Sequence, residues 1–142
     1  MRAARPGAML VANGAIRRRR STMTAISRED APVAVEGDGV ELRMLEVGGD
    51  MTAAFVRVPK GADFRPALKG LPGDLCQCPH WGYLLKGRVK MHTERGADIY
   101  AAGHAFYWAP GHAPEALEDS EYVDFSPTRE FTPVIEHIRA QS

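Results

Sequence analysis

The stretch DLCQCPHWGYLLKG, residues 74–87, sets two cysteines and a histidine directly before an aromatic and aliphatic run that a glycine closes. Successive side chains of an extended strand point to opposite faces. We therefore expect Cys76, Cys78 and His80 to share one face, with Asp74 as a further member. Two thiols and an imidazole on one interior form a ligand set that a borderline metal such as zinc accepts.

A strand that offers ligands at every second residue spreads them along its length, so it cannot complete a tetrahedral shell alone. His112 is the best remaining candidate, because Ala109 to Pro114 read as a rigid turn that would aim its side chain reproducibly. The prediction is a divalent metal site formed by Cys76, Cys78, His80 and His112, with zinc favoured over iron, magnesium or calcium. The remaining histidines are expected at the surface: His92, His104 and His137.

The face opposite His80 carries Trp81, Tyr83 and Leu85. A strand that is apolar on both faces is covered on both sides. In so short a chain the second cover is an edge of another sheet, a helix or another subunit. The last alternative predicts a homodimer.

From Val40 onward, short runs with strand character alternate with glycine and proline turns, which predicts a sandwich or barrel of seven or eight strands. The end of the chain changes to a helical period. Its apolar residues recur at i, i+3, i+4 and i+7 and predict one helix packed on the outside of the β-structure: Phe131, Val134, Ile135 and Ile138.

Charge is unevenly distributed along the 142 residues. Residues 1–22 hold six arginines and no acid, so residues 23–142 carry twelve basic and eighteen acidic residues, a net charge of −6. We expect 1–22 to be a disordered arm, or Met23 to be the true start, and 23–142 to be the single domain. An acidic domain disfavours nucleic acid as a partner, and no apolar run reaches the ~20 residues of a membrane span. Two cysteines placed two residues apart do not favour a disulfide, which suggests a cytoplasmic protein.

The spacing of these residues resembles the cupins, a family of small β-barrels with two conserved motifs. The first motif runs glycine, five residues, His-x-His, three or four residues, glutamate, six residues, glycine. With its last glycine at Gly87, the glutamate position falls on His80 and the two histidine positions fall on Asp74 and Cys76. The resemblance therefore implies a single jelly-roll barrel, all-β, with metal ligands on its inner face.

The second cupin motif runs glycine, five residues, Pro-x-Gly, two residues, histidine. Gly103 opens it and Gly111 matches its inner glycine, whereas Ala109 replaces the proline and Pro114 stands at the histidine position. His112, two residues earlier, is a substitute for that lost ligand. The run CQCPHWGY, residues 76–83, looks like that of small bacterial cupins with no assigned reaction.

Three functions are compatible with these residues. The first is a metal-binding cupin that acts on or binds a small molecule, with Tyr107 or Glu115 as a general acid or base. The second is a non-catalytic module, a ligand-binding or sensor cupin without metal. The third is redox sensing by Cys76 and Cys78, which requires an exposed thiolate of low pKa. The sequence leaves open whether the protein is an enzyme.

Overall fold

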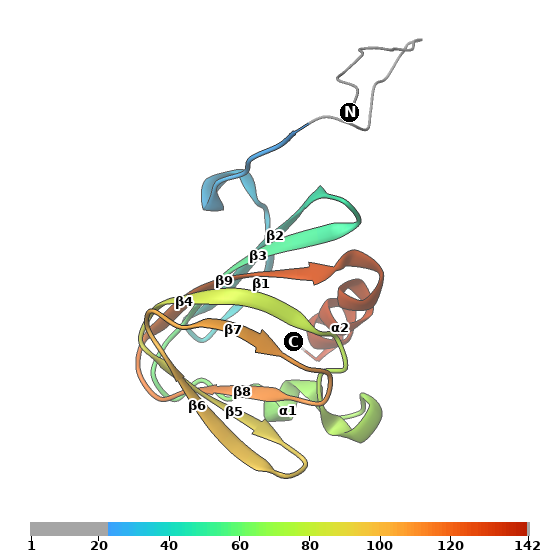
Figure 1. Ribbon diagram of the computed structural model, residues 1–142. Coiled ribbons are helices and arrows are strands. Elements are labelled where there is room, and N and C mark those ends of the chain that lie inside the picture. The colour runs from blue at the N-terminus through green and yellow to red at the C-terminus, as the bar shows by residue number, and fades with distance from the viewer. Residues whose placement is uncertain (1–22, 142) are drawn as a thin grey trace.

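Two antiparallel sheets face each other in the computed structural model, which describes residues 23–141 (Figure 1). One sheet has six strands in the order β1-β2-β3-β9-β4-β7, and the other has three in the order β6-β5-β8. Their bounds are β1 (Val33–Gly37), β2 (Val40–Gly48), β3 (Met51–Val58), β4 (His80–Lys86), β5 (Arg88–Thr93), β6 (Gly96–Ala101), β7 (Ala105–Trp108), β8 (Ala113–Ala116) and β9 (Ser120–Pro127). The predicted all-β jelly-roll architecture is confirmed.

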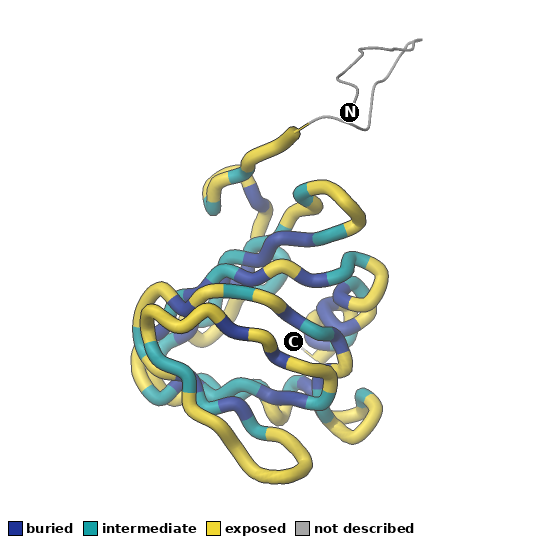
Figure 2. The backbone as a smooth tube through the Cα atoms, in the orientation of Figure 1, coloured by how far each residue is buried: buried dark blue, intermediate teal, exposed yellow. Residues whose placement is uncertain are grey.

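Alternation of side chains places the core between the two sheets (Figure 2). On β5, Val89 and Met91 are buried and face the larger sheet, as their sequence pattern predicts. On β7, Phe106 and Trp108 are buried and their rings stack, with centroids 3.6 Å apart. These aromatic rings fill the interior next to β4 and β9.

Helix α2 (Thr128–Ala140) follows β9 directly and covers one open end of the space between the sheets (Figure 1). All four residues of its predicted apolar stripe are buried, so that prediction is confirmed. The helix does more than pack on the outside of the sheets, because Phe131, Val134, Ile135 and Ile138 line the same internal cavity as residues of β4 and β9. Helix α1 (Arg65–Leu68) and two 3₁₀ turns, η1 (Arg28–Asp30) and η2 (Pro72–Asp74), complete the elements.

The prediction that Asp74, Cys76 and Cys78 lie on one extended strand with His80 is wrong. β4 begins at His80, and residues 75–79 form an irregular connection with a single bridge from Cys76 to His112. Asp74 ends the turn η2 with a left-handed backbone (φ 59°), and its carboxylate accepts a hydrogen bond from the Gly70 N–H. The alternation argument therefore holds from His80 onward and fails before it.

Two strands escaped the sequence analysis, β1 and β8. β8 is short and contains Pro114, which has no N–H to donate to a ladder and so masks a strand pattern. It pairs with β5 and gives the smaller sheet its third strand. Consequently the described residues contain nine strands rather than seven or eight.

At several positions of β4 and β9 a polar residue lies inside and an apolar residue lies outside, the reverse of the usual pattern for a sheet with one solvated face. Inward positions of β9 include Asp124 and Ser126, both buried, whereas the outward Phe125 is exposed. On β4, His80 is buried and Trp81 is exposed. This inversion produces a polar interior and an apolar outer surface on the same pair of strands.

Two sequence predictions concern matters beyond this fold. The arginine-rich arm, residues 1–22, lies outside the described residues. The prediction that Met23 is the true start therefore stays a prediction. Within residues 23–141, no helix combines the length and the hydropathy that crossing a bilayer requires.

Candidate metal centre

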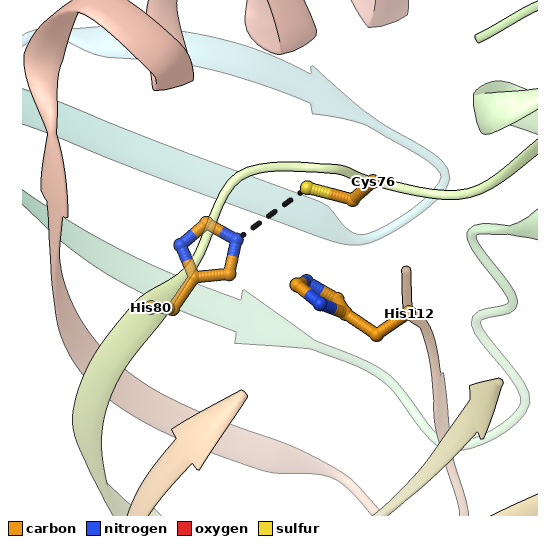
Figure 3. Close-up of side chains that lie close together, drawn as sticks. All are labelled: Cys76, His80 and His112. Carbon is orange, nitrogen blue, oxygen red and sulfur yellow. Dashed lines mark hydrogen bonds between the residues drawn. The ribbon is translucent and has the colours of Figure 1, made fainter. Parts of the chain in front are cut away.

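Cys76, His80 and His112 converge in the interior, each only 3–6% exposed (Figure 3). One potential ligand atom from each residue lies within 4.8 Å of the other two. The Cys76 Sγ atom is 3.6 Å from Nε2 of His80, and the rings of His80 and His112 have centroids 5.0 Å apart. Within residues 23–141 this is the single compact cluster of potential metal ligands that the fold assembles.

Backbone pairing brings these residues together from distant parts of the chain. The Cys76 N–H donates to the His112 carbonyl at 2.8 Å, and the His112 N–H donates back to the Cys76 carbonyl at 3.2 Å. His80 is the first residue of β4 and pairs with Trp108 of β7. The short turn from Trp108 to His112 then returns the chain to Cys76, so the cluster is fixed by hydrogen bonds of the main chain.

Each imidazole is oriented by a second hydrogen bond. Nδ1–H of His112 donates to the Ala109 carbonyl at 2.6 Å, which leaves the lone pair of Nε2 available. Nδ1 of His80 lies 2.5 Å from Oγ of Ser126, a fully buried hydroxyl of β9. With the Nδ1 proton donated to Ser126, Nε2 of His80 presents its lone pair toward Cys76. Such outer partners are typical of histidines that bind metals.

Burial keeps all three groups uncharged in the absence of a cation. It lowers the pKa of His80 to about 3, with a further contribution from His112, and it lowers the pKa of His112. Burial also raises the pKa of the Cys76 thiol to about 11. Neutral imidazoles are ready to ligate, whereas the thiol must lose its proton when a cation binds.

His112 and Trp108 separate two spaces. Behind them is a cavity of about 50 Å³, which is also lined by Cys76, His80 and the inner face of α2. In front of them is an open pocket of about 630 Å³, which contains polar side chains of Gln77 and Arg95. The cluster therefore lies one side chain away from a pocket that a small molecule can enter.

Asp124 lies beside this cluster, and sequence reasoning missed it. It lines the 50 Å³ cavity, it is 4% exposed, and its Oδ1 atom has no hydrogen-bond partner. Burial raises its pKa to about 7, opposed by the hydroxyl of Ser126. Asp124 has the same parity as Tyr122 and Ser126, but the apolar Val123 and Phe125 on either side of it predict the opposite orientation by ordinary strand alternation.

The structure does not bring Cys78, the fourth predicted ligand, into the cluster. Its Sγ donates to the Pro79 carbonyl at 3.4 Å, and burial raises the pKa of its thiol. The prediction placed Cys78 by strand parity, which does not apply to the irregular residues 75–79. Both cysteines are buried free thiols with raised pKa values, which argues against redox sensing by an exposed thiolate.

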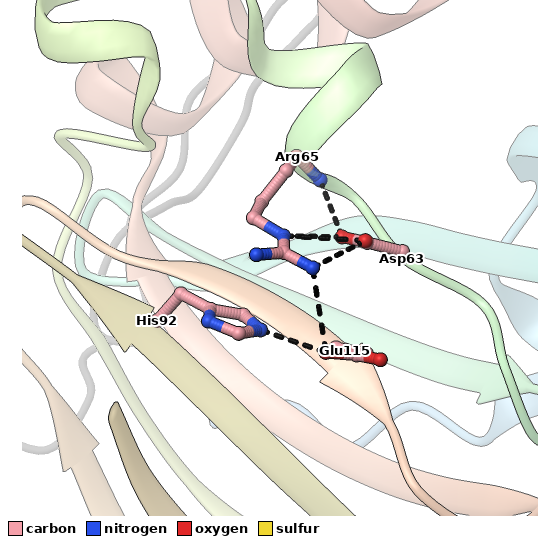
Figure 4. A network of polar contacts seen from close by, with 4 residues as sticks. All are labelled: Asp63, Arg65, His92 and Glu115. Atoms are coloured by element: carbon pink, nitrogen blue, oxygen red, sulfur yellow. Dashed lines mark hydrogen bonds and ion pairs between the residues drawn. The ribbon is translucent and has the colours of Figure 1, made fainter. Parts of the chain in front are cut away.

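The two residues suggested as general acid or base also lie elsewhere. Tyr107 is on the outer face of β7, where its ring packs against Trp81 with centroids 5.2 Å apart. Glu115 accepts a hydrogen bond from Nε2 of His92 at 2.7 Å and lies 3.6 Å from the guanidinium of Arg65, which pairs with Asp63 (Figure 4). This network joins the segment before α1 to the outside of the smaller sheet. Glu115 therefore has a structural role there, and His92 is half-buried rather than at the surface.

His104 and His137 lie outside the cluster, as predicted. Nδ1 of His104 accepts from the Ala101 N–H, and Nε2 of His137 donates to the Lys69 carbonyl. Both histidines thus stabilise connections between elements.

Comparison with solved structures gives the cupin fold, which the spacing of the glycines in the sequence also predicts. A cupin from Shewanella frigidimarina superimposes with a TM-score of 0.54 and 17% identity, over 78% of this chain and 99% of the other. KdgF from a Halomonas species superimposes with a TM-score of 0.53 and 21% identity, over 80% of this chain and 99% of the other. A variant of oxalate decarboxylase from Bacillus subtilis superimposes with a TM-score of 0.59 and 21% identity over 78% of this chain. The chain spans only 30% of that larger protein.

These matches establish that the chain has the cupin fold. No protein-family model and no curated protein sequence matches it. At 17–21% identity the likeness concerns the fold, so the chemistry must be argued from the cluster itself.

Proposed function

We propose that this protein is a small cupin that binds one divalent cation, zinc by preference, at Cys76, His80 and His112, and that it binds or acts on a small molecule beside that cation. The observation that carries the proposal is the 3.6 Å between Cys76 Sγ and His80 Nε2. Two ligands of a tetrahedral zinc ion, with Zn–S of ~2.3 Å and Zn–N of ~2.05 Å, are separated by about 3.6 Å.

The chemistry of the donors fits the same cation. One sulfur and two imidazole nitrogens suit zinc, whereas magnesium and calcium prefer oxygen ligands. Ser126 and Ala109 hold the two rings so that their remaining nitrogens face inward. A bound divalent cation would supply Lewis acidity, which polarises an oxygen of a neighbouring small molecule.

The open pocket supports a role with a small molecule. Its volume of about 630 Å³ is in the range of ligand sites, and His112 forms part of its wall. The buried indole N–H of Trp108, which lines both the pocket and the cavity, has no hydrogen-bond partner. It is a donor suited to an oxygen of the incoming molecule.

Elemental analysis of the full chain, purified without a metal-affinity tag, tests the cation site. We expect about one zinc per chain, and a loss of zinc affinity of at least ~100-fold in Cys76→Ala and His80→Ala. Cys78→Ala is the matched control, because this second buried cysteine lies outside the cluster and its variant should keep the metal. Folded protein that carries no metal and takes up none from added zinc would overturn the proposal.

A second candidate function is a cupin that binds a small ligand without any metal. The same open pocket favours it, because the polar side chains of Gln77 and Arg95 in its wall can bind a small ligand directly. Calorimetric titration of chelator-treated protein with small carboxylic acids and sugars separates the two. Binding of equal strength with and without zinc supports the metal-free function, whereas binding that requires zinc supports the first.

A further inference from the structure

Asp124 has a buried carboxylate oxygen, Oδ1, that lacks a hydrogen-bond partner. A buried carboxylate oxygen without a partner is costly, and such groups in folded proteins usually face a water, an ion or a ligand. Its Oδ1 has neither a donor nor solvent, and Asp124 lines the cavity that Cys76, His80 and His112 also line. The cavity of about 50 Å³ has room for a single ion or water.

We infer that Asp124 is a fourth donor to the cation held by Cys76, His80 and His112. The inference rests on the proposed function and specifies the complete ligand set of the site: one thiolate, two imidazoles and one carboxylate. Two anionic donors would balance the charge of a divalent cation in a buried site, which explains why a carboxylate is tolerated there. The pocket side of His112 stays open for the small molecule.

The strands on both sides of Asp124 leave room for an inward side chain at this position. Asp124 pairs with Ala54 on β3 and with Gly82 on β4. A Cβ on Gly82 would lie 2.8 Å from the Cβ of Asp124 and 2.5 Å from the ring of Phe106. Glycine at position 82 therefore leaves the space that the Asp124 Cβ and the Phe106 ring occupy.

Titration of metal-free protein with Co²⁺ and Zn²⁺ tests the assignment. We expect Asp124→Asn and Asp124→Ala to weaken Zn²⁺ binding about tenfold or more and to shift the visible absorption of the Co²⁺ form, since the ligand field changes. Glu121→Gln is the matched control, because Glu121 lies on the same strand but forms an ion pair with Arg57. It should leave both readouts unchanged.

The outcomes separate this inference from the proposed function. Zinc binding that depends on Cys76 and His80 but is unchanged, within twofold and with the same Co²⁺ spectrum, in both Asp124 variants would overturn the fourth donor alone. Wild-type protein that binds neither ion would overturn the cation site and the inference together. Asparagine replaces one carboxylate oxygen of aspartate by an amide nitrogen, so Asp124→Asn tests the charge with little change in side-chain volume.

The outer surface of β9, β4 and β7 exposes large apolar side chains, and this observation supports a second inference. We define the aromatic face as Trp81, Tyr83, Leu85, Tyr107 and Phe125. These side chains are between 39% and 56% exposed. Trp81 is paired in register with Phe125 on one side and with Tyr107 on the other, so the three rings form one row across the sheet.

We propose that the aromatic face binds a second copy of this chain in a symmetric dimer. Large apolar side chains of ~200 Å² that are half exposed offer on the order of 450 Å² together. A standard interface buries about 800 Å² per partner, of which slightly more than half is apolar, so the aromatic face has the area that one side of such a dimer needs. Of the charged residues with the same outward parity, Glu121 and Arg57 form an ion pair with each other, so two identical copies meet at the centre of the face without an unpaired charge.

Sedimentation equilibrium of the full chain tests the dimer. We expect the wild type to be dimeric at micromolar concentrations and Trp81→Glu to be monomeric with an unchanged circular dichroism spectrum. Ile99→Glu is the matched control, because Ile99 is also half exposed but belongs to β6 in the other sheet. Monomeric wild-type protein, or a Trp81→Glu variant that stays dimeric, would overturn this inference.

Discussion

Gly87→Ala is expected to destabilise the protein by about 3 kcal/mol and to lower its Tm by about 10 °C. Gly87 forms the turn between β4 and β5 with φ +88°, a left-handed conformation that costs an alanine ~1 kcal/mol. A Cβ there would also lie 2.2 Å from Oγ of Ser120 and 2.3 Å from the Asp119 carbonyl. Ser120 cannot give way easily, because it is buried and its hydroxyl accepts from the Arg88 N–H and donates to the Glu118 carbonyl.

Gly103→Ala separates the two causes of that loss. Gly103 has nearly the same backbone conformation (φ +95°), but no atom lies within 4 Å of the place where its Cβ would stand. We therefore expect only the conformational cost, about 1 kcal/mol. Urea unfolding of both variants measures the difference. Equal losses at the two positions would mean that the crowding around Ser120 relaxes freely.

The fold was largely accessible from the sequence, because two kinds of local signal agreed with each other. Glycine spacing indicated the cupin architecture, and period-two alternation correctly assigned the faces of β4 and β5, as Met91 inside and Trp81 outside demonstrate. The helical period was equally clear over α2. Where proline interrupts the pattern, as in β8, the sequence signal for a strand disappears although the pairing remains.

The site was only partly accessible. His80 and Cys76 came from strand parity and motif alignment, and His112 from the rigidity of its turn. Parity also assigned Cys78 to the site, and this assignment lacks support because residues 75–79 pair through one bridge instead of a ladder. A residue outside a regular strand can point in any direction, so alternation carries no information about it.

Asp124 was missed for a different reason. A strand with apolar residues at alternate positions is normally interpreted with those residues inside, and this rule predicts that Val123 and Phe125 face the core. The real orientation is the opposite, since Asp124 and Ser126 face the interior beside the buried Tyr122, whereas Phe125 is exposed. One inverted pattern therefore underlies both inferences: a buried carboxylate oxygen without a hydrogen-bond partner, and exposed aromatic side chains on the outer face.

Metal-free wild-type protein is expected to lose less stability between pH 6.5 and about 4 than metal-free Asp124→Asn does. The pKa of His80 is lowered from 6.5 to about 3, so its contribution to stability is lost as the pH falls through that range. The total is on the order of 4 kcal/mol. His112 adds to this loss, because its pKa is also lowered.

Asp124 acts in the opposite direction. Its pKa is raised from 3.8 to about 7, so the folded state binds a proton that the unfolded state releases, and stability increases as the pH falls from 7 to about 4. The two effects offset each other where their ranges overlap. Asp124→Asn removes only the second, so the urea midpoint of this variant should fall more steeply from pH 6.5 to pH 4 than that of the wild type. Parallel curves for the two proteins would show that the buried carboxyl carries no such proton. Because bound zinc would hold both histidines neutral and Asp124 ionised, zinc should convert the wild-type curve into one that falls steeply toward acid, where protons displace the cation.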